Sequence, residues 1–192
     1  MKQIDTFSAH SLKILDKDIN DFKDKFIYGL NLYKKDERAT LGQKFHALIC
    51  FYINNFEVSK LIEDLNEKEK VIWKNLENVL STQKQNFIKT EYSFLVKDEL
   101  NYKNYYLTGR YDAIYKEDDQ YIIYDWKTLN LPNEPENDLQ SVVYLYCASK
   151  IFNTEKIKMR YLSIEKLNFI DVDFAGVDIY KSRIDGIISK IA

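Results

Sequence analysis

The sequence predicts an α/β fold in which a central mixed β-sheet, an antiparallel meander followed by a crossover helix, is flanked by helices. Three observations support this class. Apolar residues recur every three or four positions through residues 8–82, which is the period of amphipathic helices. Residues 86–128 instead contain runs rich in β-branched and aromatic side chains, which favour strands. Only 5 glycines and 2 prolines occur among 192 residues, so long regular elements are favoured over a loop-rich scaffold.

Four helices are expected in the N-terminal part. The first is capped by Ser8 or Ser11, and the second begins with Thr40 as its cap and ends at Ile53. Two more cover residues 58–64 and 67–80. Charged residues alternate with the apolar stripes of these helices and predict ordinary solvated faces. The apolar stripe of the first helix consists of Leu12, Leu15, Ile19, Phe22 and Phe26.

Three strands then form the predicted meander, at residues 87–96, 105–115 and 120–128. The first turn is expected at residues 97–101 and the second at 116–119, where polar residues cluster. The third strand is almost wholly apolar until Asp125, as expected for a central strand that is covered on both faces.

The remaining elements complete one domain. Asn137 or Asp138 begins a helix through Ile151, after a loop that holds both prolines. Two strands at 156–164 and 167–174 and a closing helix at 178–191 follow. We therefore expect a single domain over residues 1–192, made of N-terminal helices (8–82), a catalytic sheet core (86–174) and a C-terminal helix (177–191).

Composition restricts the possible functions. The net charge of −2 argues against a broad basic surface for sequence-independent nucleic-acid binding, but not against an enzyme whose bound cations supply positive charge. Two cysteines are too few for a four-thiolate metal or iron–sulfur site. No apolar run approaches the roughly 18 residues of a membrane span, and no signal peptide is evident at the N-terminus. These features predict a soluble protein of the reducing cytoplasm that has no membrane partner.

Charged and polar side chains in the predicted core elements require an explanation. Asp112 lies within a strand, where aspartate is disfavoured, although alone it would suit an exposed edge strand. Asp125 and Lys127 are two residues apart and share one face of their strand; alone they would suit an ion pair at a strand end. Gln140 and Tyr144 share a helical face, which alone indicates only a polar surface.

Taken together, the two aspartates and the lysine indicate a metal-dependent hydrolase. If the strands of Asp112 and Asp125 pair, their carboxylates meet at one end of the sheet and offer the hard oxygen ligands that Mg²⁺ or Mn²⁺ prefers. Such an ion lowers the pKa of a bound water and neutralises charge on phosphoryl oxygens. Lys127 faces the same way and is suited to hold the attacking water or to stabilise developing charge.

At this point the sequence resembles the PD-(D/E)xK nuclease superfamily in its RecB-like branch, which includes the nuclease domains of AddA/AddB helicase–nucleases and CRISPR-associated adaptation nucleases. The resemblance spans roughly residues 8–163, with four short motifs in the family's order. They are Leu41-Gly42-Gln43-Lys44-Phe45-His46, Gly109-Arg110-Tyr111-Asp112, Ile122-Ile123-Tyr124-Asp125-Trp126-Lys127-Thr128 and Gln140-Ser141-Val142-Val143-Tyr144.

The resemblance implies a restriction-endonuclease-like fold and a role for each matching residue. It implies that His46 is a metal ligand, although alone this histidine would suit a position in or at the edge of the core. It further implies Asp112 and Asp125 as carboxylate ligands, with the backbone carbonyl of Trp126 completing the metal site. Lys127 would be the catalytic lysine. Gln140 and Tyr144 would orient the site and touch the nucleic-acid backbone, and Glu91 has a supporting role.

The implied activity is that of a Mg²⁺- or Mn²⁺-dependent DNA nuclease that hydrolyses phosphodiester bonds by metal-activated water. Exonuclease action in DNA repair or recombination is favoured, on single strands or ends, and a protein partner for targeting is compatible with a stand-alone domain. No iron–sulfur cluster is expected, and no phosphate-binding Gly-x-x-x-x-Gly-Lys-Ser/Thr loop for ATP occurs. The preference for DNA over RNA and the polarity stay open.

Two alternatives remain, a catalytically silent module that binds nucleic acid or protein on the same fold, and a structural domain without a nucleic-acid role. The intact set of His46, Asp112, Asp125 and Lys127 argues against a silent module. Surface roles are also open for two groups. Aromatic residues that could stack on bases, or lie in the core, are Tyr105, Tyr111 and Trp126; cations that could contact phosphates, or be solvated, are Arg110, Lys158 and Arg160.

Overall fold

The computed structural model of the protein describes residues 4–30, 37–128 and 130–191. Within these segments six strands form one mixed sheet in the order β1-β3-β4-β5-β6, and β2 also pairs with β3. The β2–β3–β4 part is the predicted antiparallel meander, and β5 returns parallel to β4 after the helix α6. The strands are β1 (Thr6–Ser8), β2 (Phe87–Leu100), β3 (Lys103–Glu117), β4 (Gln120–Lys127), β5 (Ile157–Ser163) and β6 (Phe169–Asp173).

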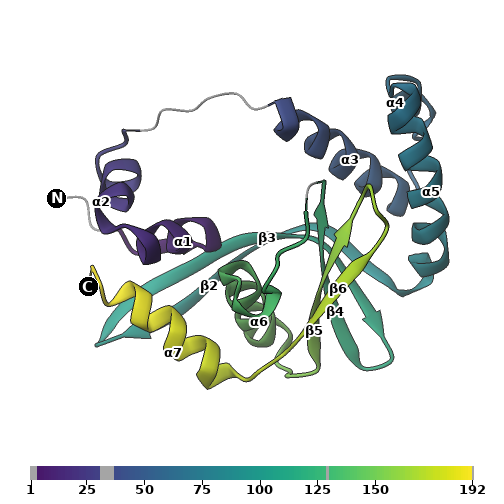
Figure 1. Ribbon diagram of the computed structural model, residues 1–192. Helices are drawn as coiled ribbons and strands as arrows, with labels where there is room; N and C mark the ends of the chain where they lie inside the picture. Colours follow the sequence, from purple (N-terminus) through teal and green to yellow (C-terminus); the bar gives the residue numbers. More distant parts are fainter. Residues whose placement is uncertain (1–3, 31–36, 129, 192) are drawn as a thin grey trace.

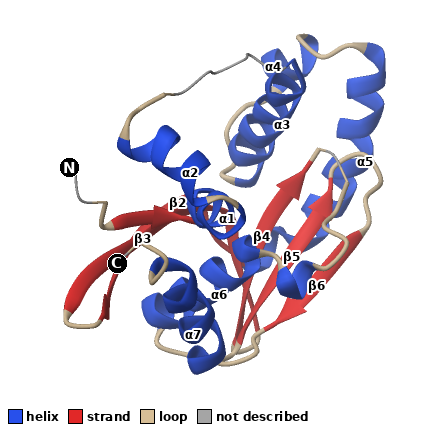
Figure 2. Ribbon diagram, turned by 60° about the vertical axis from the view of Figure 1, so that its left-hand side comes forward, coloured by secondary structure: helices blue, strands red, loops and turns tan. Residues whose placement is uncertain are grey.

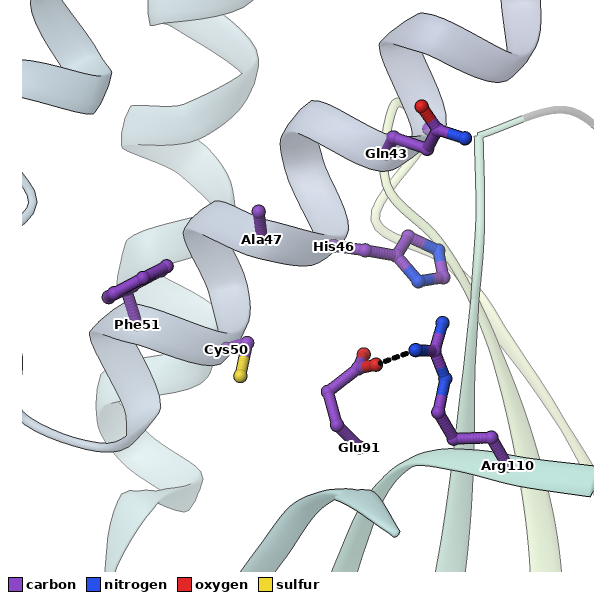
Figure 3. Close-up of a pocket in the computed structure, with 8 residues that line it drawn as sticks. Gln43, His46, Ala47, Cys50, Phe51, Glu91 and Arg110 are labelled. Atoms are coloured by element: carbon purple, nitrogen blue, oxygen red, sulfur yellow. Dashed lines mark ion pairs between the residues drawn. The ribbon is translucent and has the colours of Figure 1, made fainter. Parts of the chain in front are cut away.

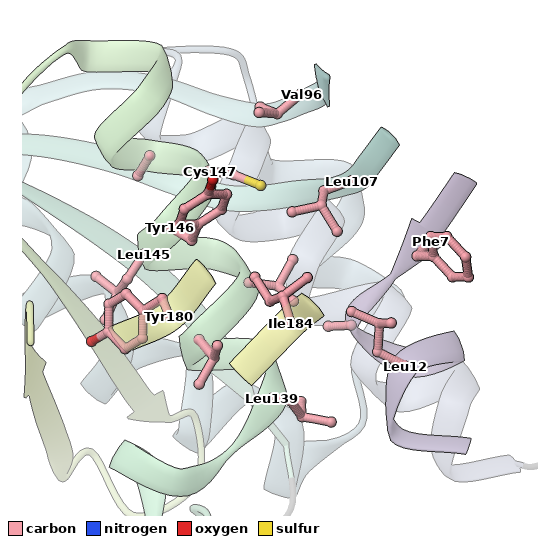
Figure 4. Close-up of a cluster of buried hydrophobic side chains, with 14 of the residues drawn as sticks. Phe7, Leu12, Val96, Leu107, Leu139, Leu145, Tyr146, Cys147, Tyr180 and Ile184 are labelled. Atoms are coloured by element: carbon pink, nitrogen blue, oxygen red, sulfur yellow. The ribbon is translucent and has the colours of Figure 1, made fainter. Parts of the chain in front are cut away.

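Helices cover both faces of this sheet (Figures 1 and 2). One buried core joins α1, α6 and α7 to the sheet, and a second joins α3 and α5 to the opposite face. In the first core, side chains from α6 and α7 meet Phe7 and Leu12 of the N-terminal segment (Figure 4). The helical elements are α1 (Ala9–Lys17), α2 (Ile19–Phe22), the π-helical turn η1 (Lys23–Ile27), α3 (Glu37–Ile53), α4 (Ser59–Glu63), α5 (Glu67–Gln83), the 3₁₀ turns η2 (Lys84–Asn86) and η3 (Pro135–Asn137), α6 (Leu139–Phe152) and α7 (Val177–Ile188).

The hairpin between β2 and β3 is longer than the sequence pattern predicts. The strands continue through residues 97–100 and 103–104, and the turn consists of Asn101 and Tyr102 alone. Both turn residues have positive φ values, 52° and 64°, as a two-residue hairpin turn of the I′ kind requires. The polar run at 97–101 was therefore wrongly predicted to be the turn. One of its residues, Asp98, is engaged by Tyr146 and Lys181, so this polar residue serves tertiary contacts.

The strands β3 and β4 separate at the position of the two aspartates. Their ladder pairs Ala113 with Tyr124 and ends there, although one further step would place Asp112 opposite Asp125. Beyond this point β4 pairs with β5, whereas β3 pairs through residues 106–108 with β1. We call this gap, bordered by residues 109–112 of β3 and 125–127 of β4, the β3–β4 split.

The strand β3 also changes layers at the β3–β4 split. Leu107 and Tyr111 belong to the core under α1, α6 and α7, whereas Ala113 and Tyr115 belong to the core under α3 and α5. Ile114 still belongs to the first core, so beyond Asp112 the strand lies between the two cores, with side chains in both. A carboxylate at this position can therefore be reached both from α3 and from the end of β4.

The helix boundaries near the N-terminus differ from the prediction in two respects and agree in a third. The first predicted helix is interrupted at Asp18, whose side chain accepts from the backbone N–H groups of Asn20 and Asp21, so that a new helix, α2, begins there. The cap of α1 is Ser8, one of the two predicted candidates, and it forms a reciprocal capping box with the other, Ser11. The helix α3 begins at Glu37, so Thr40 is not its cap.

The short strand β1 was not predicted, because three residues are too few to show a periodic pattern.

The roles left open for the aromatic residues can be compared with their burial. Tyr105, Tyr111 and Trp126 are buried in the cores and present no face on which a base could stack. Among the described residues, no helix has the length and apolarity needed to cross a membrane.

Candidate metal and catalytic site

Asp112 is a buried carboxylate whose two oxygens point to different elements. The backbone N–H of Trp126 donates to Oδ2 at 2.8 Å, which ties β4 to β3 across the β3–β4 split. Oδ1 lies 3.4 Å from Nδ1 of His46, a residue of α3. One oxygen of Asp112 therefore holds the split together, and the other faces the histidine.

His46 bridges the two strands of the split from the helix side. Its Nε2 lies 3.0 Å from the carbonyl oxygen of Trp126. That oxygen can only accept, so Nε2 carries the proton in this contact. A neutral imidazole then turns the lone pair of Nδ1 toward the carboxylate of Asp112, a pair of acceptors that needs a proton or a cation between them. Burial lowers the pKa of His46, but the hydrogen bond and charge of Asp112 outweigh it, so the pKa is raised.

Glu91 of β2 completes a group of metal-binding side chains. The register pairs the residues on either side of Glu91 with those on either side of Asp112, so the two carboxylates lie across from each other. Ligand atoms of His46, Glu91 and Asp112 all lie within 4.8 Å of one another. Glu91 has a φ of 51°, which is uncommon for a non-glycine residue and costly inside a strand. The strained backbone at this position is consistent with a functional constraint on the direction of the side chain.

Arg110 is the cation that faces this group. Its Nη1 lies 2.7 Å from Oε2 of Glu91, and its side chain is largely exposed. Both residues line a pocket of about 550 Å³ beside α3, together with Gly42, Gln43, His46, Ala47, Cys50 and Phe51 (Figure 3). The ion pair of Glu91 and Arg110 thus lies in an open pocket that reaches the metal-binding side chains.

Asp125 and Lys127 occupy the other border of the split. Lys127 Nζ lies 2.7 Å from Oδ2 of Asp125 and donates to Oε1 of Gln140 at 3.0 Å. The amide nitrogen of Gln140 in turn donates to Oδ1 of Asp125. Burial and the charge of Asp112 raise the pKa of Asp125 to about 6, although Lys127 acts in the opposite direction. Oδ2 of Asp125 is buried, and the Lys127 ammonium is its one close partner among the described residues.

Tyr144 acts on the backbone of β3. Its hydroxyl donates to the carbonyl of Arg110 at 3.0 Å, and its ring packs against Tyr111 and close to Gly109. A Cβ at Gly109 would lie 2.5 Å from the ring of Phe94, so no larger residue fits without movement. Burial, with the charges of Asp125 and Asp112, raises the pKa of Tyr144 to about 12. The hydroxyl is therefore a hydrogen-bond donor at neutral pH.

The structure brings the sequence-predicted residues together in two connected groups. His46, Asp112 and the Trp126 carbonyl form one, and Asp125, Lys127 and Gln140 form the other. Glu91 was given only a supporting role, yet its carboxylate lies beside His46 and Asp112. Its position across from Asp112 would follow from the sequence if the hairpin turn were located correctly at residues 101–102.

The donor set suits a divalent ion. An imidazole, carboxylates and a backbone carbonyl are ligands that Mn²⁺ accepts, and the oxygen donors also suit Mg²⁺. Positive charge would relieve the approach of two acceptors, Nδ1 of His46 and Oδ1 of Asp112, and would offset the repulsion between the buried carboxylates of Asp112 and Asp125. The residues present therefore fit a metal ion.

Comparison with known proteins agrees with this geometry. Residues 22–183 match the sequence model of the PD-(D/E)XK nuclease superfamily. The chain belongs to this superfamily. Membership implies a nuclease, and the restriction-endonuclease-like architecture agrees with the mixed sheet between helices.

A solved structure also resembles the chain. It is described as the crystal structure of SSO0001, with a TM-score of 0.52 and 16% sequence identity, and the match covers 99% of this chain and 76% of that one. At this identity the likeness concerns the fold alone. A search of curated proteins finds no significant match. Placement in the RecB-like branch stays a prediction.

Proposed function

We propose that the protein is a divalent-metal-dependent DNA nuclease of the RecB-like type, which hydrolyses phosphodiester bonds. The observation that supports this most is the convergence of His46, Glu91 and Asp112 within 4.8 Å of one another, from a helix and two strands. A structural role alone does not require three such groups around a strained backbone position. Superfamily membership supports the same reaction class.

In this proposal His46, Asp112, Glu91 and the Trp126 carbonyl would hold Mg²⁺ or Mn²⁺, with Asp125 as a further carboxylate ligand. When bound, such an ion lowers the pKa of water and neutralises charge on the phosphoryl group. Of these ligands, His46 and Glu91 line the pocket beside α3, whose wall also includes the largely exposed Arg110.

Lys127 supplies the protein's own positive charge to the reaction. Gln140 fixes the ammonium by accepting from it at 3.0 Å, and Asp125 lies 2.7 Å from it on the other side. A preorganised ammonium of this kind can hold the attacking water or stabilise charge on the phosphate without reorganisation during the reaction. Tyr144 acts as a positioning residue, because it binds the Arg110 carbonyl and so supports β3 at the split.

The finer features of the proposal rest on the sequence resemblance. They are exonuclease-type action, a preference for single strands or ends, a setting in DNA repair or recombination in the cytoplasm, and a protein partner for targeting. The open pocket of about 550 Å³ beside the proposed ligands is compatible with a strand end or an unpaired segment.

The decisive experiment compares the wild-type protein with Asp125→Ala and Lys127→Ala. Labelled single- and double-stranded DNA and RNA are incubated with each protein in Mg²⁺, Mn²⁺ or EDTA. We expect metal-dependent cleavage by the wild-type protein alone. Cleavage in EDTA, or by both variants at the wild-type rate, would contradict the mechanism. Metal binding and nucleic-acid binding without cleavage would favour the silent binding module.

A further inference from the structure

Two exposed phenylalanines lie at the end of α3 beside the pocket of the proposed metal ligands. Phe51 lines that pocket with a side chain that is 44% exposed, and Phe56, just beyond the helix, is 62% exposed. Their ring centroids are 5.6 Å apart, in an edge-to-face arrangement. Figure 3 shows Phe51 on the same helix as His46, further along toward the C-terminal end. We call these two side chains the Phe51–Phe56 pair.

The end of α3 holds this pair in place. Phe56 N–H donates to the carbonyl of Phe51 at 2.9 Å, and Asn55 N–H donates to that of Tyr52 at 3.1 Å. Asn55 has a φ of 64°, so the two hydrogen bonds form a Schellman motif, which commonly includes an apolar contact between these positions. The motif explains why Phe56 touches Phe51. It does not require aromatic rings, nor does it explain why both remain so exposed.

The pair lies beside the proposed metal ligands because one pocket joins them. Phe51 lines the same pocket as His46, Glu91 and Arg110. A strand whose phosphate enters this pocket near Arg110 would bring a neighbouring base within reach of the exposed ring of Phe51. Arg110, at the opposite wall of the same pocket, provides the nearby positive charge.

We propose that the Phe51–Phe56 pair is a stacking subsite for an unpaired base of the strand being cut. This inference rests on the proposed nuclease function and adds the residues that would select an unpaired strand or end. A base inside a duplex has both faces stacked on its neighbours, so it could use this subsite only after being extruded. An unpaired base can stack on an aromatic side chain regardless of its identity.

The test measures affinity for a short fluorescein-labelled single-stranded DNA in Mn²⁺ at fixed salt, with Lys127→Ala present in every protein to prevent cleavage. We expect Phe51→Ala and Phe51→Leu to weaken binding about 5- to 100-fold, the range for losing one base–aromatic stack. Phe51→Trp should bind within about threefold of the parent, because indole also offers a stacking face. The leucine variant keeps the apolar contact of the helix end and therefore separates stacking from folding.

Two controls locate the effect. Tyr102→Ala removes an aromatic side chain that is 96% exposed in the β2–β3 turn, and it should leave affinity unchanged. A series of oligonucleotides each carries one abasic site, at a different position in each. The parent protein should bind one member of the series more weakly than the others, whereas Phe51→Leu should bind all members equally. A 2-aminopurine at that position should be quenched by the parent protein only.

The outcomes distinguish this inference from the proposed function. If otherwise wild-type protein cleaves DNA but Phe51→Leu binds as tightly as the parent, the stacking subsite is wrong and the nuclease proposal stands. Equal losses from Tyr102→Ala and Phe51→Leu would also overturn it. If the wild-type protein neither cleaves nor binds any nucleic acid, the proposed function fails and the stacking subsite fails with it.

Discussion

The β3–β4 split and the face formed by β5 and β6 both carry charged residues on strands, but they treat those charges differently. On the β5–β6 face, Arg160 and Asp171 are directly opposite in register, and Nε and Nη2 of the arginine each lie 2.6 Å from a different carboxylate oxygen. Lys158 lies 3.6 Å from the same carboxylate, and the guanidinium packs over the ring of Phe169. These charges satisfy one another.

At the β3–β4 split the charges remain incompletely satisfied. Asp112 and Asp125 are both buried carboxylates, and Glu91 lies across from Asp112. Among the described residues, Lys127 is the one lysine or arginine that pairs with either aspartate. Burial and the neighbouring charge of Asp112 raise the pKa of Asp125 to about 6. A charged residue on a strand is therefore weak evidence for a site, whereas buried charges that lack a complete set of partners are strong evidence.

The largest effect is expected when the same substitution, aspartate to asparagine, is made in each of the two regions. Asp112→Asn should reduce the rate of DNA cleavage at least about 1000-fold, because it removes a negative ligand from the proposed metal site. Asp171→Asn makes the same chemical change on the β5–β6 face and should leave the rate within about twofold, since Asp171 touches none of the proposed ligands. Single-turnover cleavage with Mn²⁺ measures both rates.

Thermal unfolding of the two variants serves as the control for folding. The amide oxygen that Asp112→Asn introduces can still accept from the Trp126 backbone N–H, so this variant should remain folded. Equal cleavage by wild type and Asp112→Asn would remove the functional difference between the regions. A loss of cleavage in Asp171→Asn without unfolding would extend the site to the β5–β6 face.

A smaller effect is expected at Glu91. Glu91→Gln should weaken Mn²⁺ binding about 10- to 100-fold, measured by isothermal titration calorimetry, because a carboxylate in the group of potential ligands becomes neutral. Glu99→Gln, on the exposed part of the same strand, is the matched control and should bind Mn²⁺ as the wild type does. If the two variants bind equally, Glu91 serves only its ion pair with Arg110.

Much of the split could be predicted from the sequence because its parts are encoded locally. The apolar run before Asp125 predicts a central strand, and Asp138 predicts the start of α6. Asp125 and Gln140, which meet at one border of the split, therefore lie at predictable places on these two elements. His46 required more, since nothing in its own helix predicts a contact with Trp126, 80 residues later. Only the order of the four motifs indicated that contact.

The sequence pattern did not predict the register of β2 and β3, and therefore did not predict that Glu91 lies across from Asp112. In a hairpin the turn sets which residues face each other, so a turn wrongly predicted at 97–101 gives no correct partner for Asp112. Likewise, the polar pattern did not reveal that Arg160 and Lys158 share Asp171, because their pairing depends on the register of β5 and β6. Cross-strand contacts of this kind follow from register rather than from composition.

Stability on the β5–β6 face should depend on pH. Burial alone would raise the pKa of Asp171. The hydrogen bonds and charge of Arg160 favour the carboxylate more strongly, so the pKa is lowered overall. A lowered folded pKa means that the stabilisation is present above the ordinary value of 3.8 and is lost as the pH falls through the folded pKa. Asp171→Asn should therefore lower the free energy of unfolding by about 1–2 kcal/mol at pH 7, with partial exposure limiting the effect.

Urea unfolding at several pH values measures this dependence. The difference between wild type and Asp171→Asn should shrink as the pH is lowered below about 4, where the wild-type carboxylate begins to take up its proton. A difference that stays constant down to the acid limit would show that Asp171 stabilises the face by shape rather than by charge.

The smallest effect is expected at Lys158. Its ammonium lies 3.6 Å from Asp171 and its side chain is mostly buried, so it is not available to a phosphate. Lys158→Ala should change the affinity for single-stranded DNA less than about twofold, whereas Arg110→Ala should weaken it several-fold and reduce its salt dependence by about one phosphate contact. Arg110 is the informative contrast. A metal ion at Glu91 would free its guanidinium for the pocket, whereas Lys158 and Arg160 both stay paired with Asp171. A salt titration of DNA affinity measures both variants. If Lys158→Ala and Arg110→Ala lose the same affinity, nucleic acid also contacts the β5–β6 face, and the paired charges there bind phosphate as well as Arg110 does.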